Sequence, residues 1–303
     1  MLDAASSRGR FALTDKPADE YLPWNGHVTD NVVLLEDGSH LAIIRLDGRP
    51  LLLNDDRGRY AIRRARHSVL RAMADTRVML YEHHVCHDRV EPFRLGKFRS
   101  EYSRSLAQDY HDGLTKNLLA REWFMTIMVK PSPLTGLINM FRRGKNRADE
   151  DCVRLLEEKV SSIIHMMRHY HPVRLGTRWS NGVPFSEIGE AIRLVLYARF
   201  HPVPITTGTL AGSVYTDRVI CGQRGFEVLG PDRSNFGVLW GFRDYPEVTR
   251  PMIMDGVLMA DCRLVMTNSF RFKSTASASD RMSLTQRRMT TANDRAVSLK
   301  EGL

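Results

Sequence analysis

The residues with the most evident chemistry lie in one ten-residue stretch, YEHHVCHDRV, at positions 81–90. It holds three histidines, a cysteine, a glutamate and an aspartate, which are side chains that bind metal ions or transfer protons. Successive side chains of a strand point to opposite faces. Four potential ligands would therefore share one face, namely Glu82, His84, Cys86 and Asp88. The opposite face would carry Tyr81, His83, Val85 and His87.

Distances along a strand limit this possible metal site. Neighbours on one face are about 6.6 Å apart, since each residue rises about 3.3 Å. A zinc ion holds its ligands at about 2.0–2.3 Å, so two neighbouring side chains can share an ion, but all four require a bend. No second cluster of ligands in the sequence obviously completes the site. We favour the end of a partly exposed strand without a catalytic role, and a metal-dependent hydrolase is the alternative.

Other histidines and the cysteines give weaker signals. His165 and His169 have the i, i+4 spacing of helical metal ligands, with His171 just beyond, but no glutamate completes an HExxH pattern. We interpret them as the basic end of a helix, where positive charge is favourable. The four cysteines at 86, 152, 221 and 262 form no CxxC pair, so we expect reduced, partly buried thiols.

Common catalytic and nucleotide-binding motifs are missing from the sequence. It contains no GxSxG, no GxGxxG and no GxxxxGK(S/T). The nearest fragment, GLINMFRRGKNR, separates Gly136 from Gly144 by too many residues, and Asn146 follows Lys145. It does not match the loop whose backbone N–H groups surround a phosphate. We therefore assign no catalytic, cofactor-binding or metal-binding residue and expect this chain alone to be inactive as an ATPase.

Composition indicates a cytoplasmic protein with an acidic partner. The 303 residues carry a formal net charge of +9, with basic clusters at 62–67 and 141–147. Nucleic acid, an anionic lipid surface or an acidic protein would each complement this charge. No run approaches the roughly 18 apolar residues of a membrane span, and residues 1–20 do not have the pattern of a signal peptide.

Periodicity predicts an α+β fold of two sequential subdomains, each an α/β sandwich with a mainly antiparallel sheet and helices packed on it. Residues 1–27 form an extended arm, in which Pro23 and Gly26 argue against regular structure. Residues 28–205 form the first subdomain, with a basic insertion at about 131–147. Its expected strands are near 31–36, 40–46, 76–88 and 121–130, and its helices lie within 55–75, 98–120, 148–170 and 184–200.

The second subdomain, 206–303, follows a break rich in Pro, Gly and Thr near 201–212. It is predicted to contain three short strands in 213–246, a short helix in 247–260, a strand in 261–273 and a long polar helix in 275–303. That helix carries Arg281, Arg287, Arg288, Arg295 and Lys300. Its apolar residues, expected to pack against a further domain or a neighbouring subunit, are Met282, Leu284, Met289, Ala292 and Val297.

An ordered set of segments carries a family resemblance. The marks are GFEVLG at 225–230, YPEVTRPMIMDGVL at 245–258, LVMTNSFRF at 264–272 and LTQRRMTTANDRAVSL at 284–299. Looser matches are YLPWNGHVTD at 21–30 and DGSHLAIIRLDG at 37–48. Together they resemble the N-terminal and central region of the type IV secretion and conjugation ATPases, the CagE/TrbE/VirB family.

The resemblance implies a non-catalytic scaffold. In this family such a region is peripheral at the cytoplasmic face of the inner membrane and contacts other secretion components. A RecA-like domain, which is missing from this sequence, binds ATP and Mg and works as a hexamer to power substrate translocation or pilus biogenesis. The expected partners are inner-membrane secretion components, further copies of the chain and an anionic membrane surface. A basic nucleic-acid-binding module, supported by FRFK at 270–273, is the alternative function.

Overall fold

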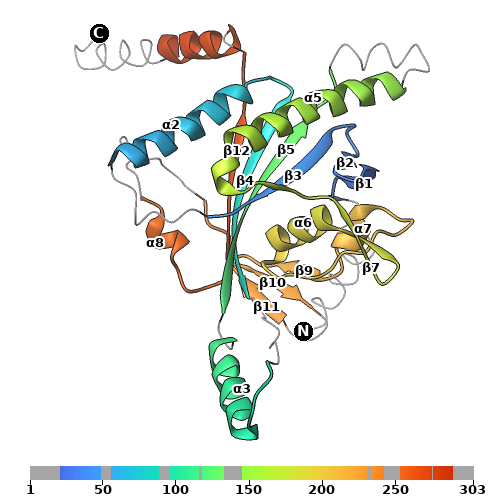
Figure 1. Ribbon diagram of the computed structural model, residues 1–303. Coiled ribbons are helices and arrows are strands. Elements are labelled where there is room, and N and C mark those ends of the chain that lie inside the picture. Colours follow the sequence, from blue (N-terminus) through green and yellow to red (C-terminus); the bar gives the residue numbers. More distant parts are fainter. Residues whose placement is uncertain are drawn as a thin grey trace, which may run out of the picture.

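In the computed structural model, long antiparallel strands organise the molecule (Figure 1). The structure describes residues 21–48, 56–88, 96–115, 118–132, 145–230, 234–241, 253–274 and 276–288. The main sheet has seven strands in the order β1-β2-β3-β5-β4-β12, with β6 also paired to β3. These strands are β1 (Trp24–Thr29), β2 (Val32–Leu35), β3 (His40–Leu46), β4 (Val78–Asp88), β5 (Leu119–Val129), β6 (Val173–Arg174) and β12 (Leu264–Arg271). The strand pairs of this sheet are antiparallel, and the predicted α+β class is confirmed.

Helices cover both faces of the main sheet. On one face lie α2 (Asp56–Ala72) and α5 (Lys145–Met166), whose apolar stripes meet alternate side chains of the strands, such as Ile44, Leu80 and Ile127. On the other face lie α6 (Glu187–Tyr197) and α7 (Leu210–Val214), over Ile43, Phe124 and other buried residues. Burying both faces removes a large apolar area from water, which is the main stabilisation of such a sandwich.

Three smaller units extend from this sandwich. Helix α3 (Glu101–Thr115) joins β4 to β5 and stands away from the helices of the body, at the far end of these long strands (Figure 1). The hairpin of β7 (Thr177–Ser180) and β8 (Val183–Ser186) turns at Asn181 and Gly182, both with positive φ, as a two-residue turn requires. The strands β9 (Arg218–Cys221), β10 (Phe226–Leu229) and β11 (Ser234–Gly237) form a small sheet of their own.

Two sequence predictions about these elements are wrong. Trp24–Thr29 is a strand despite Pro23 and Gly26, because register shifts next to Gly26 let it pair with β2. The strand β12, assigned to the second subdomain, pairs along its whole length with β4 of the first sheet. The boundary near residue 205 therefore does not separate the sheets, and the division into two subdomains stays a prediction. The remaining elements are the 3-10 helix Arg168–Tyr170, α8 (Asp255–Leu258) and a helix at 276–288.

Candidate docking surface

The cluster in β4 contains a buried ion pair. The Glu82 side chain is 1% exposed and accepts a hydrogen bond from the guanidinium of Arg66 on α2. The imidazole Nε2 of His84 lies 3.5 Å from Glu82 Oε1. Burial raises the pKa of the Glu82 carboxyl, but the hydrogen bond with His84 and the charge of Arg66 outweigh burial, so the pKa lies below its usual value. Two neighbours therefore stabilise the Glu82 charge without a metal.

The contacts of these residues support the alternation of faces predicted for this stretch. Glu82 faces α2, whereas Tyr81 and Val85 belong to the core on the α6 side. Cys86 and His87 are buried, whereas Tyr81, His83 and His84 are half-buried and Asp88 is exposed, so this end of the strand is partly exposed, as predicted. Strand β12 covers this end of β4, beginning with Leu264 opposite Cys86. Within the described residues, no three His, Cys, Asp or Glu side chains are placed to share a metal ion.

The other candidate residues are dispersed. His165, His169 and His171 are exposed at the end of α5 and beyond it. Cys86 and Cys152 are buried, while Cys221 and Cys262 are exposed. The aromatic side chains of FRFK do not form a surface for stacking bases, because Phe270 and Phe272 pack against the core under α2 and α5. Most of the basic insertion at 131–147 and the last residues of the chain lie outside the described residues.

The most exposed apolar side chains of the small sheet follow its edge strand. The register places Phe236 of β11, Glu227 of β10 and Ile220 of β9 side by side on one face. Phe236 is 80% exposed, and the chain continues through Val238, Leu239 and Trp240, of which the last two are 87% and 84% exposed. We call residues 236–240 the apolar segment. Several large exposed apolar side chains next to one another are typical of an interaction site.

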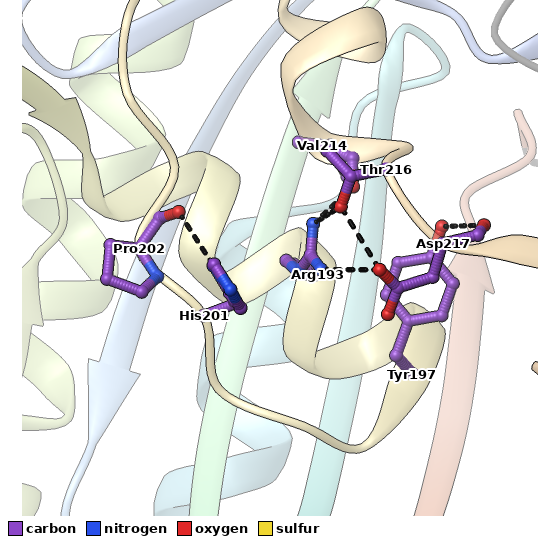
Figure 2. A network of polar contacts seen from close by, with 7 residues as sticks. All are labelled: Arg193, Tyr197, His201, Pro202, Val214, Thr216 and Asp217. Atoms are coloured by element: carbon purple, nitrogen blue, oxygen red, sulfur yellow. Dashed lines mark hydrogen bonds and ion pairs between the residues drawn. The ribbon is translucent and has the colours of Figure 1, made fainter. Parts of the chain in front are cut away.

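A buried polar network fixes the chain that leads into this small sheet (Figure 2). The guanidinium of Arg193 on α6 donates to Asp217 Oδ1 at 3.0 Å, to the carbonyl oxygen of Val214 at 3.1 Å and to the hydroxyl of Thr216. The side chains of Arg193 and Asp217 are each 4% exposed. Tyr197 adds a bond from its hydroxyl to the Asp217 carbonyl at 3.4 Å. The network therefore anchors the residue just before β9 to helix α6.

Little in the sequence pointed to this surface. Phe236 and Leu239 were expected in a region of short strands, and a single sequence does not show which face of a small sheet is uncovered. The helix at 276–288 is a second exposed element, with Met282 and Leu284 turned to solvent at 73% and 54% exposure. None of the described helices combines the length and apolar character needed to cross a membrane.

Two family descriptions match the chain. "Type IV secretion system ATPase VirB4/TrbE, N-terminal domain" matches residues 31–136, and "CagE, TrbE, VirB family, component of type IV transporter system" matches residues 173–301. Protein virB4 of Agrobacterium fabrum is 37% identical over 295 residues, which are 96% of this chain. The type IV secretion system protein virB4 of Bartonella henselae is 28% identical over 294 residues, 94% of this chain, and that of Brucella abortus is 20% identical over 316 residues, 98% of it.

The chain belongs to the VirB4/TrbE family. It spans 37% of the length of each of these VirB4 relatives. The two matched regions meet in one sheet, because the VirB4/TrbE N-terminal region supplies β2–β5 and the second region supplies β6 and β12. Members of this family are components of the type IV secretion machinery, as we predicted from the sequence.

Proposed function

We propose that this chain is the N-terminal assembly region of a type IV secretion ATPase, which docks the motor on inner-membrane components from the cytoplasmic side. The observation that carries the proposal is the extent of the match. VirB4 relatives align with 96% of the chain, yet these 303 residues contain no GxxxxGK(S/T) loop. In this proposal ATP and Mg bind elsewhere in the full-length protein, which works as a hexamer.

The exposed features support a docking role. The apolar segment and the helix at 276–288 present Phe236, Trp240 and Met282 to solvent. Apolar side chains of this size are stabilised when a partner removes them from water. The net charge of +9 favours an anionic membrane surface close to the docking site. A nucleic-acid-binding module is less well supported, because the aromatic residues of FRFK are engaged in the core.

A fractionation experiment tests the docking role. The chain is expressed in cells that contain, or lack, the inner-membrane components of the secretion system. We expect the wild type in the membrane fraction only when those components are present. A Phe236→Ser/Leu239→Ser/Trp240→Ser variant should move to the soluble fraction, while a Trp179→Ser control on β7, 73% exposed, should stay. Equal fractionation of all three proteins would refute the role of the apolar segment.

An assay of ATP hydrolysis tests whether this chain alone lacks the ATPase activity of the full-length protein. The purified chain with Mg and ATP should show no turnover above a buffer blank, because no residue in it is assigned to phosphate binding. Robust turnover that follows the folded chain through purification would overturn the proposal.

A further inference from the structure

Helix α3 carries an apolar stripe without a place to bury it in the described body. Tyr102, Leu106 and Tyr110 follow the i, i+4, i+8 spacing of one helix face, and they are 76%, 57% and 70% exposed. Figure 1 shows α3 beyond the end of β4 and β5, away from the helices that cover the main sheet. We call these three residues the α3 stripe.

The α6 side of the main sheet contains an apolar groove of about 440 Å³. The paired strands β3, β5 and β4 form its floor in three rows. The register places Leu41, Met128 and Met79 in the first row, Ile43, Thr126 and Tyr81 in the second, and Phe124 and His83 in the third. Helix α6 supplies one wall through Ile192, Val195 and Leu196, and Trp24 and Leu35 supply another.

The dimensions of the two features agree. From Tyr102 to Tyr110 a helix rises about 12 Å, at about 1.5 Å per residue. From Met128 to Phe124 the floor of the groove extends about 13 Å, at about 3.3 Å per residue. Three side chains spaced along one helix face therefore match three rows of the floor.

Charges at the two ends also complement each other. The first row ends at an exposed rim with two carboxylates, Glu36 and Asp37, against one ammonium group, Lys130. Next to the third row lies the exposed Arg45, which pairs with Phe124 but does not line the groove. Helix α3 has the matching polarity, because the exposed Lys97 and Arg99 precede its first turn and the exposed Asp109 and Asp112 lie near its end. The start of α3 thus fits the Glu36 and Asp37 rim, and its end fits Arg45.

We propose that the α3 stripe of one copy of this chain inserts into the apolar groove of a second copy. In Figure 1, α3 lies where β4 ends and β5 begins. The groove is lined by residues 79–83 of β4 and 124–128 of β5, toward the other end of this strand pair, so the contact forms between molecules. The stripe and the groove are different surfaces, so the contact is head-to-tail and each copy keeps one of each for the next. Such contacts close into rings when the rotation between copies permits. The inference uses the geometry of the chain and does not require the proposed role in docking an ATPase.

Two single substitutions, each placed on an exposed residue, test the contact. Leu106→Asp introduces a charge into the stripe, and Leu196→Asp introduces one into the wall of the groove, where Leu196 is 36% exposed. We expect the wild type to self-associate in light scattering and sedimentation as concentration rises. Each variant should weaken association at least about tenfold, since an unpaired charge is costly in an apolar contact. Trp179→Asp, on the β7 hairpin, should associate like the wild type.

Mixing the two variants gives the decisive measurement. A head-to-tail contact leaves the Leu106→Asp chain with an intact groove and the Leu196→Asp chain with an intact stripe. The equimolar mixture should therefore form a dimer of one chain of each kind and grow no further. A mixture that stays monomeric, with circular dichroism showing both variants folded, would overturn the proposal, as would a wild type that stays monomeric. Self-association lost with Leu106→Asp but kept with Leu196→Asp would indicate pairing between α3 helices and also refute it.

Discussion

At the scale of single residues, the interaction with the largest expected effect on stability is the buried Arg193–Asp217 ion pair. A buried charge that loses its partner is far more costly than an exposed one, because burial removes the water that would solvate it. Asp217 would keep only Thr216 as a side-chain partner if the guanidinium were removed. The pair therefore holds the start of the small sheet against α6. Removing one partner should lower the free energy of unfolding by a measurable amount.

We expect Arg193→Met to lower the free energy of unfolding by about 3–5 kcal/mol, since it leaves the Asp217 carboxylate buried without its cation. Urea unfolding followed by circular dichroism gives this value. Arg154→Met removes an exposed pair with Asp151, whose side chains are 81% and 57% exposed, and should cost under about 1 kcal/mol. Equal costs for the two substitutions would contradict the importance of burial.

His83 makes stability depend on pH. Burial lowers its pKa from 6.5 to about 4, with a smaller effect of His84 in the same direction and an opposing effect of Glu82. The unfolded chain therefore binds a proton between pH 6.5 and 4 that the folded chain does not bind. Stability from this group is fully present above pH 6.5 and is lost as the pH falls toward 4.

His83→Gln should flatten this part of the profile, because glutamine does not titrate while its amide can still reach Thr267, the partner of His83 Nδ1 at 2.9 Å. The measurement is the urea midpoint at several pH values between 4 and 7. A residual slope is expected from His27, whose pKa burial also lowers. An unchanged slope in the variant would show that His83 is protonated equally in both states.

At the scale of elements, the small sheet depends on close backbone contacts at glycine. A Cβ on Gly225 would lie 2.6 Å from the carbonyl oxygen of Gly237. A backbone atom cannot move aside as a side chain can, so Gly225→Ala should push β11 away from β10 and loosen the apolar segment. Hydrogen exchange should become faster in 226–237 and stay unchanged in the main sheet. Gly241→Ala, with no atom within 4 Å of the added Cβ, is the control.

Local patterns predicted most long elements and missed those that depend on distant partners. The alternation of apolar residues predicted a strand at 40–46, as observed, and the helical spacing of Val69 and Met73 predicted α2. The Asn181-Gly182 turn is a hairpin signal that the sequence reading overlooked. By contrast, the burial of Glu82 and Cys86 depends on α2 and β12, which no local pattern links to β4. The exposure of the apolar segment could not be predicted for the same reason.

At the scale of the whole molecule, β12 decides whether the two predicted subdomains are independent. It supplies the strand next to β4, and Phe270 from β12 packs against the same core as α2 and α5. Residues 206–303 therefore complete the sheet that residues 28–205 begin. The division at residue 205 predicts instead that 28–205 folds by itself.

Two truncated chains distinguish these expectations. A chain that ends at 205 leaves β4 as an open edge and exposes core side chains, so we expect it to aggregate or to unfold at much lower urea concentration. A chain that ends at 275 keeps β12 and, among the described residues, loses only the exposed helix at 276–288. It should therefore unfold within a few tenths of a molar of the full chain, as expected for a small change in stability. Circular dichroism and light scattering report both outcomes. A soluble 1–205 chain with the same urea midpoint as the full chain would show that the first subdomain is independent and that the β4–β12 pairing adds little to its stability.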